Sequence, residues 1–199
     1  MTLWSRDDVA SWRAALACYA ASCAQRARAR EASRLVELDA WYQRALPAAL
    51  GARDPAYVTA DELARVTEWK MKRGKYRARN LMLVRGNADA DVRLRSEAAF
   101  AAIPDPRRPI VELTSLAGVG PATASAVLAA LRPDVYPFFD EAIAAQIARL
   151  GEVAFTTPYY LRYAEQLRAR AAALGPPWTA HTVGQALWAA AARRANDAP

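Results

Sequence analysis

Residues 110–131 carry two short apolar stripes at helical spacing, one on each side of a glycine turn. The apolar positions are Ile110, Val111, Leu113 and Leu116 before the turn, and Ala124, Ala126, Val127, Leu128 and Leu131 after it. Apolar residues that recur every three or four positions predict the buried face of a helix. The segment therefore restricts this part of the chain to two helices joined by a tight hairpin.

The turn has the sequence Gly118-Val119-Gly120-Pro121. Gly118 and Gly120 permit positive φ and a close approach of the backbone, and Pro121 suits the first turn of the following helix. Backbone N–H groups at a helix N-terminus favour an anion such as a nucleic-acid phosphate, and they bind it without reading any base. The alternative is a corner that only joins two core helices.

The rest of the chain also predicts helices. Period-two alternation of useful length is absent from the sequence. Thr59 to Glu62 form a capping box, and Asn87 and Thr179 are expected to cap further helices. Ser5 is expected to cap a long N-terminal helix that ends near Arg30. We therefore expect an all-α fold.

Composition excludes several classes of protein. The chain has 199 residues, of which 54% are hydrophobic, which is enough to bury a sizeable core. No apolar run approaches the roughly 18 residues of a membrane span, and no signal-sequence pattern opens the chain, so we expect a cytoplasmic protein that does not associate with membranes. We also expect a monomer. Cys18, Cys23 and His181 are too few and too scattered for a disulfide or zinc site, and His181 is expected to be a capping or interface residue.

Many of the cationic residues lie in one short basic cluster. The net charge is +7, and all three lysines of the chain fall within six positions. This clustering predicts a phosphate-contact surface with aromatic side chains between the cations. The alternative is a solvated helix face that ends at Gly74. The cluster consists of Trp69, Lys70, Lys72, Arg73, Lys75, Tyr76, Arg77 and Arg79.

The segment Leu113–Gly151 resembles the helix-hairpin-helix motif and trailing acid of base-excision DNA glycosylases, the endonuclease III and adenine glycosylase superfamily. In that family an aspartate follows the first hairpin glycine at a characteristic distance, and Asp140 stands 22 positions after Gly118. The resemblance implies that Asp140 is the catalytic acid and that the partner is double-stranded DNA. It also implies that a monovalent cation can bind the hairpin carbonyls.

The sequence departs from the family pattern in three places. Bifunctional members carry a Schiff-base lysine where this chain has Ala122, so a monofunctional, water-using glycosylase is implied, with a displaced lysine such as Lys75 left open. The residues around the acid are Phe139-Asp140-Glu141-Ala142 instead of Val-Asp-Thr-His. Four C-terminal cysteines are missing, so no iron–sulfur cluster is expected.

The resemblance also implies the architecture. It predicts two interlocked helical lobes, one made of residues 31–139 and ending in the hairpin at about 110–131, the other of residues 1–30 and 140–199. Asp140 would then lie at the seam, where a pocket for an extruded base is expected. Its position at a helix start is expected to keep it ionised.

These patterns together predict the site residues. The catalytic residue would be Asp140, with Glu141 a surface or capping group. The DNA contacts would be Gly118, Val119, Gly120, Ala122, Thr123, Lys70, Lys72, Arg73, Lys75 and Arg77. The base pocket would be lined by Tyr136, Phe138, Trp69 and Tyr76.

The predicted reaction is hydrolysis of the N-glycosidic bond of a damaged or mismatched base that has rotated out of the stack. One alternative is a non-catalytic module that binds DNA or RNA, in which Asp140 is only a helix cap. Another is an adaptor that binds other proteins, whose binding would not weaken as salt rises.

Overall fold

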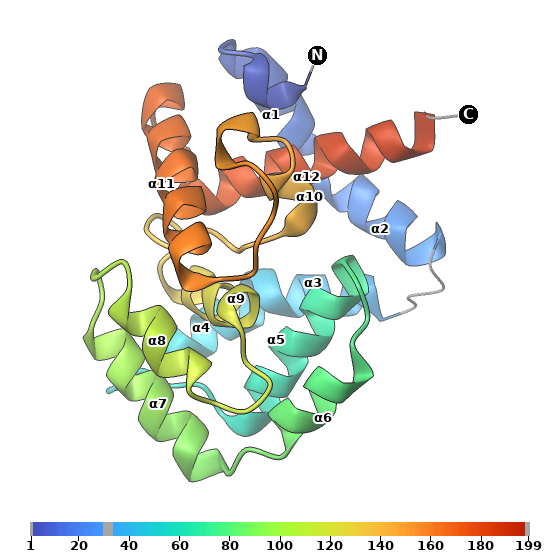
Figure 1. The fold of residues 1–199 in the computed structure, drawn as a ribbon. Helices are drawn as coiled ribbons and strands as arrows, with labels where there is room; N and C mark the ends of the chain where they lie inside the picture. The colour runs from blue at the N-terminus through green and yellow to red at the C-terminus, as the bar shows by residue number, and fades with distance from the viewer. Residues whose placement is uncertain (1, 30–33, 198–199) are drawn as a thin grey trace.

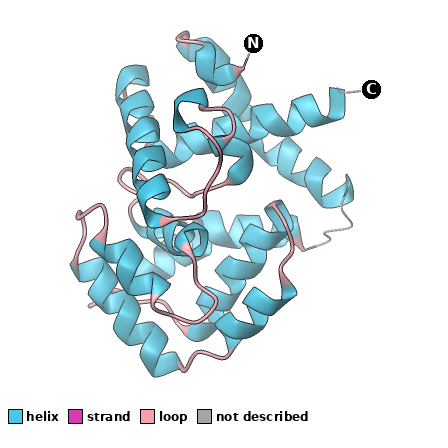
Figure 2. Ribbon diagram, in the orientation of Figure 1, coloured by secondary structure: helices cyan, strands magenta, loops and turns pink. Residues whose placement is uncertain are grey.

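The computed structural model describes residues 2–29 and 34–197, and this part of the chain contains helices and loops but no strand (Figure 2). The all-α prediction is confirmed. The helices are α1 (Val9–Ala17), α2 (Tyr19–Ala29), α3 (Leu35–Ala40), α4 (Leu46–Gly51), α5 (Ala60–Arg73), α6 (Ala78–Arg85), α7 (Asp89–Ala101), α8 (Arg108–Thr114), α9 (Pro121–Leu131), α10 (Glu141–Ala144), α11 (Thr157–Leu174) and α12 (Ala180–Asp197). A π-helical segment, Trp41–Ala45, joins α3 to α4.

The two ends of the chain pack together. Helix α12 lies against α1, α2, α10 and α11, whereas α5 lies against α3, α6, α7 and α9 (Figure 1). The predicted boundary at residues 30 and 31 falls outside the described residues. No described helix is both long enough and apolar enough to cross a membrane.

Several helix ends follow from local sequence. At the start of α5 the Thr59 hydroxyl accepts from the Glu62 N–H at 3.2 Å, and the Glu62 carboxylate accepts from the Thr59 N–H at 2.9 Å, so the predicted capping box is confirmed. The Thr179 hydroxyl accepts from the Thr182 N–H at 3.1 Å at the start of α12. Gly74 ends α5, as expected.

Two predicted caps were wrong. Asp8, and not Ser5, caps α1 by accepting from the Ser11 N–H at 2.7 Å, and the N-terminal helix breaks at Cys18 into α1 and α2. Asn87 does not cap α7, which begins at Asp89 with Ala88 as its N-cap.

Asn87 instead holds the hairpin. Its side-chain oxygen accepts from the Ala117 N–H at 2.9 Å, and its amide nitrogen donates to the Ala117 carbonyl, also at 2.9 Å. A sequence signal typical of a cap therefore belongs to a contact between the end of α6 and the hairpin loop.

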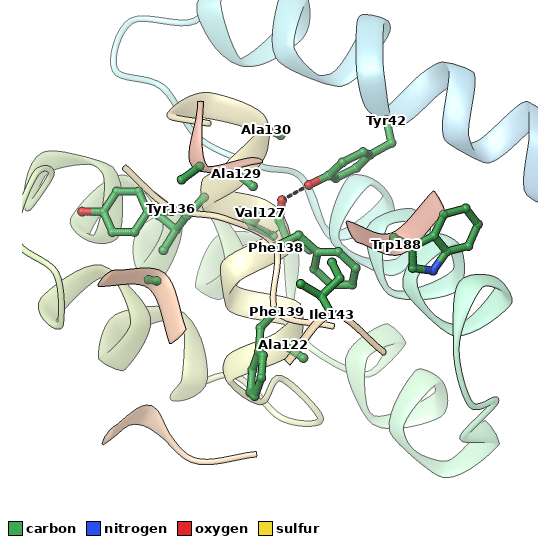
Figure 3. Close-up of a cluster of buried hydrophobic side chains, with 14 of the residues drawn as sticks. Tyr42, Ala122, Val127, Ala129, Ala130, Tyr136, Phe138, Phe139, Ile143 and Trp188 are labelled. Atoms are coloured by element: carbon green, nitrogen blue, oxygen red, sulfur yellow. Dashed lines mark hydrogen bonds between the residues drawn. The ribbon is translucent and has the colours of Figure 1, made fainter. Parts of the chain in front are cut away.

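Helix α9 is buried on nearly all sides. Every residue from Ala122 to Ala130 is buried, because α4, α5 and α8 pack around it. Its small side chains let these neighbours approach closely, and the Tyr42 hydroxyl donates to the Ala126 carbonyl at 2.7 Å (Figure 3). A helix that is apolar all round belongs in a core, so the hairpin rests on a rigid base.

Candidate functional site

The two hairpin glycines serve different purposes. Gly118 has φ +75°, and a Cβ there would lie 2.6 Å from the Asn80 carbonyl oxygen and 2.8 Å from Leu83 Cβ, so both the backbone conformation and contact with α6 require glycine. Gly120 has φ −103°, and a Cβ would meet nothing within 4 Å. The expectation of positive φ thus holds for Gly118 only, while the space beside Gly120 is open to a ligand.

Of the hairpin N–H groups expected to bind an anion, that of Val119 is already used within the hairpin. The Val119 N–H donates to the Leu116 carbonyl at 3.2 Å, and Val119 and Thr123 are buried. The N–H groups of Gly120 and Ala122 have no acceptor within the part of the chain that the structure describes. These two groups, from the partly exposed Gly120 and from Ala122, which is 7% exposed, are therefore unpaired donors at the start of α9.

A cavity of about 220 Å³ lies beside these N–H groups; it is called the hairpin cavity below. Two cationic residues line it together with the start of α9. Its lining residues are Lys70, Arg77, Asn80, Gly120, Pro121, Ala122 and Phe155. Positive charge and unpaired N–H groups on one wall together favour a phosphate.

Asp140 caps α10 and lies between two further cavities. The Asp140 Oδ1 accepts from the Ala142 N–H at 2.8 Å, and the whole residue is 9% exposed. On one side is a small cavity of about 70 Å³ that Lys70, Ala122 and Phe138 also line; we call it the lysine cavity. On the other side is a larger one of about 310 Å³, here called the tryptophan cavity, which reaches Trp188 on α12. Asp140 thus contributes to the lining of both cavities.

The charge of Asp140 is set by two opposing effects. Burial raises the pKa of Asp140 above its usual value, whereas Arg73, the Ala142 N–H and Arg26 lower it. This differs from the expectation that a helix dipole dominates, because α10 is only four residues long and a short helix has little dipole. Arg73 is the strongest of the opposing influences.

Arg73 differs most from its predicted role. It is 2% exposed and lies inside the protein, so it is not placed to contact a phosphate on the surface. One of its terminal nitrogens lies 3.7 Å from Asp140 Oδ2, and the other lies 4.0 Å from Asp39 Oδ1 and donates to the Tyr19 hydroxyl. We call Tyr19, Asp39, Arg73 and Asp140 the buried ionic cluster.

Aromatic rings surround the guanidinium group. It lies 4.3 Å from the ring centroid of Trp188 and 4.9 Å from that of Trp69. Asp39 also accepts from the Tyr19 hydroxyl at 2.7 Å and from Trp69 Nε1 at 2.9 Å. Hydrogen bonds and cation–π contacts together offset the cost of burying these charges.

The basic cluster divides by position. Lys70 lines both the lysine and hairpin cavities, and burial together with nearby Arg77 lowers the pKa of Lys70 to about 8, against the opposing effect of Asp140. Lys75 lies 3.2 Å from Glu141 in an exposed ion pair. Lys72 lines none of the three cavities, whereas Arg77 is exposed and lines two of them.

The four residues predicted to line a base pocket occupy different environments. Phe138 lines the lysine cavity, whereas Tyr136 points to the other side of the segment after α9 and donates to the Asp105 carbonyl at 2.7 Å (Figure 3). Trp69 is buried and stacks on Tyr42 with ring centroids 3.7 Å apart. Tyr76 is 63% exposed.

Sequence reasoning missed Phe155 as a candidate. This residue precedes α11, is 46% exposed and lines both the lysine and hairpin cavities. Its ring centroid lies 5.2 Å from that of Phe139. The sequence feature that could have indicated Phe155 is an aromatic residue in a predicted loop, outside the apolar stripes of the predicted helices.

His181 offers no acid–base chemistry near neutral pH. It is buried, and burial together with the charge of Arg73 lowers the pKa of His181 to about 3. Among the described residues no group of three or more His, Cys, Asp or Glu side chains could hold a metal ion. The titratable groups that face the three cavities are therefore mainly carboxyl, amine and guanidinium groups.

Comparison with known proteins adds no relative. The chain matches no protein-family model, no curated protein and no solved structure. The chemistry of the site must therefore be inferred from its geometry. A recessed carboxyl group beside a cationic, N–H-lined surface can bind a polyanion and act on a group that reaches into the recess.

Proposed function

We propose that this chain binds double-stranded DNA and hydrolyses the N-glycosidic bond of a damaged or mismatched base, as a glycosylase of the helix-hairpin-helix type. The observation that carries the proposal is the position of Asp140. Asp140 lines the lysine cavity together with Ala122, whose own N–H lies at the start of the hairpin helix. An acid and the start of the hairpin helix therefore border the same cavity, which supports the proposal.

Binding would begin at the hairpin cavity. The N–H groups of Gly120 and Ala122 would donate to one phosphate, with positive charge from Arg77 and Lys70 on the same wall. The open space beside Gly120 allows the strand to approach the backbone closely. A monovalent cation on the hairpin carbonyls, and a monomeric protein, are further parts of the proposal.

The extruded nucleotide would occupy the two cavities beside Asp140. The tryptophan cavity has a volume near the lower end of the roughly 300–1,000 Å³ of ligand pockets. The sugar would then lie next to Asp140. In the proposed two-lobe architecture, the acid would lie at the junction of the lobes.

Catalysis would rest on an ionised carboxylate. As the bond from C1′ to the base nitrogen breaks, positive charge develops on the sugar, and the Asp140 carboxylate stabilises it and orients the attacking water. Water supplies a hydroxyl group to C1′, and its proton passes to the carboxylate or to the departing base. Arg73 supports this role because its charge opposes the effect of burial on Asp140.

One observation favours the non-catalytic alternative, a module that binds DNA or RNA. Both carboxylate oxygens of Asp140 already have protein partners, the Ala142 N–H for Oδ1 and Arg73 for Oδ2. In that case Asp140 would serve only as a cap and an ion-pair partner.

A panel of duplexes with alkylated, deaminated and oxidised bases distinguishes the glycosylase from the non-catalytic binding module. We expect the wild type to release at least one lesion base and Asp140→Asn to release it at least about 100-fold more slowly, with duplex binding retained because asparagine still caps α10. The comparison variant is Glu141→Gln, which removes a carboxylate from the lining of the same two cavities and leaves the cap of α10 in place. Salt-dependent binding with no release from any lesion by the wild type would establish the binding module instead.

A further inference from the structure

The hairpin cavity differs from the other two cavities in the charge of its lining. Of the described residues that line it, none is acidic and two are cationic, Lys70 and Arg77. The lysine and tryptophan cavities, by contrast, each include both Asp140 and Glu141. The hairpin cavity therefore offers positive charge without a carboxylate in its lining.

The cavity also brings together hydrogen-bond donors that have no partner among the described residues. The Lys70 amine, the Arg77 guanidinium and the Asn80 side-chain amide form no hydrogen bond or ion pair with these residues. The N–H groups of Gly120 and Ala122 have no acceptor among them either. These donors come from α5, from the start of α6 and from the start of α9, and they border one space. Donors without partners in a recess favour a ligand that supplies acceptors.

The cavity has room for a phosphate group. Its volume of about 220 Å³ is several times the roughly 30 Å³ that one water molecule occupies in the liquid. One wall is a helix N-terminus, where backbone N–H groups and the helix dipole favour an anion. A tetrahedral oxyanion can therefore enter and meet donors from more than one helix.

A terminal phosphate monoester matches these donors better than an internal phosphodiester does. Each internal phosphate of a strand carries a single negative charge. A monoester carries about −1.5 to −2 charges at neutral pH and has three strong acceptor oxygens. Hydrogen bonds that involve charged groups are stronger than those between neutral groups, so the added charge and the added oxygen both increase binding.

We propose that the hairpin cavity binds the terminal phosphate monoester of a broken strand, so that the protein recognises a nicked duplex as well as an intact one. The assignment of the ligand to DNA rests on the proposed function, of which it needs the binding step and not the base release. Such an end arises when a strand is cut at an abasic sugar. The same hairpin would then hold the duplex both before and after that cut.

The protonation of Lys70 should make this binding depend on pH. Burial and nearby Arg77 lower the pKa of Lys70 to about 8, whereas Asp140 raises it, and Lys75 and Glu141 line the lysine cavity that Lys70 also borders. The second pKa of a phosphate monoester is about 6, so the monoester loses charge below that pH. Lys70 loses its charge above about pH 8, or somewhat higher when a bound dianion favours the protonated amine. We therefore expect the preference for a phosphate-bearing nick to be largest between these two limits.

The test compares duplexes of one sequence that differ only at a central nick. One nick carries a 5′-phosphate, another carries a 3′-phosphate, and the third has hydroxyl groups on both sides. Fluorescence anisotropy measures the dissociation constant of each duplex. We expect the wild type to bind at least one phosphate-bearing nick about tenfold or more tighter than the hydroxyl nick, the change expected for one added charge-assisted hydrogen bond. The preferred nick identifies which end occupies the cavity.

Three variants test whether the cavity causes the preference. Lys70→Met removes the amine and keeps a long side chain, and it should abolish both the preference and its decline above pH 8. Asn80→Ala removes a neutral donor on α6 and should weaken the preference by less, and it provides a second variant in case Lys70→Met disturbs folding. The control is Arg85→Met, which removes an exposed charge outside the three cavities and should weaken the binding of every nick by a similar factor.

Equal dissociation constants for the three nicks, or a full preference in Lys70→Met, would overturn the proposal. Inorganic phosphate should bind more weakly than the nicked end because it lacks the flanking strand, and equally tight binding would overturn the assignment to a strand end. The assay contains no damaged base. A protein that prefers a phosphate-bearing nick but releases no base would therefore refute the proposed glycosylase alone, whereas one that releases bases and binds all nicks equally would refute the phosphate site alone.

Discussion

The hairpin and the buried ionic cluster are built on opposite principles, although Ala122 and Asp140 bring them to the same cavity. The hairpin offers uncharged backbone N–H groups, and its conformation depends on one positive φ and one close contact, both at Gly118. The buried ionic cluster depends on charged side chains from α3, α5 and the start of α10, and on the Tyr19 hydroxyl from α2. The hairpin therefore fixes where a strand would bind, while the cluster fixes the charge available for chemistry.

This difference predicts how each region tolerates change. Backbone groups keep their positions when neighbouring side chains change, provided that the turn itself is preserved. A buried ionic cluster is different, because removing one member leaves an opposite charge without a partner in a poorly solvated place. Substitution of Arg73, which two buried carboxylates share, should thus be costly, and so should substitution at one of the two hairpin glycines but not at the other.

The largest effect is expected for Arg73→Met. Loss of the guanidinium leaves Asp39 and Asp140 buried without their cation, and we expect the free energy of unfolding to fall by about 3–5 kcal/mol. Urea unfolding followed by circular dichroism measures this change. The matched control is Arg79→Met on the exposed start of α6, with an expected change within about 0.5 kcal/mol; equal effects at both positions would contradict the comparison.

The pH dependence of Arg73→Met distinguishes charge from packing. Without Arg73, burial raises the pKa of Asp140 further, so the folded state of the variant binds this proton more tightly than the unfolded state does. Lowering the pH then favours the folded state, and the difference in stability from the wild type should be smaller at pH 5 than at pH 8. A difference that does not change with pH would indicate lost packing alone.

The next effect is expected for Gly118→Ala. Positive φ costs about 1–2 kcal/mol, and the contacts of a new Cβ with Asn80 and Leu83 add about 1–3 kcal/mol of overpacking. Gly120→Ala is the matched variant: its φ is ordinary and its Cβ has room, so stability should change by less than about 1 kcal/mol. If a strand approaches Gly120 closely, Gly120→Ala should nevertheless weaken DNA binding, as fluorescence anisotropy would show.

The smallest effect is expected for Asn87→Ala. It removes both hydrogen bonds to Ala117, but these groups are partly exposed and water can replace the amide, so we expect a loss of about 1 kcal/mol. Asn87→Asp keeps the acceptor for the Ala117 N–H and loses the donor, and should fall between the wild type and Asn87→Ala. Hydrogen exchange at Ala117 checks the order, and faster exchange in Asn87→Asp than in Asn87→Ala would contradict it.

The sequence predicted those features whose partners are close along the chain. The capping box at Thr59 joins residues three positions apart, and Gly118 lies within a four-residue turn, so local patterns sufficed. The partners of Arg73 come from segments that are distant along the chain. The basic cluster predicted a phosphate-contact surface, and nothing in its sequence indicated that the Arg73 side chain is buried. Asn87 is similar, since an asparagine that reaches 30 residues along the chain looks like an ordinary helix cap.

The single guanidinium of Arg73 touches partners from near the start, the first third and the last third of the chain. Moving these segments apart would leave several buried charges without partners at once. We therefore expect the recess around Asp140 to be preformed and stiff, and not to close over the ligand by a large movement. Discrimination between lesions would then depend on whether an extruded base fits a shape that already exists, and a poorly fitting base would be rejected before any chemistry begins.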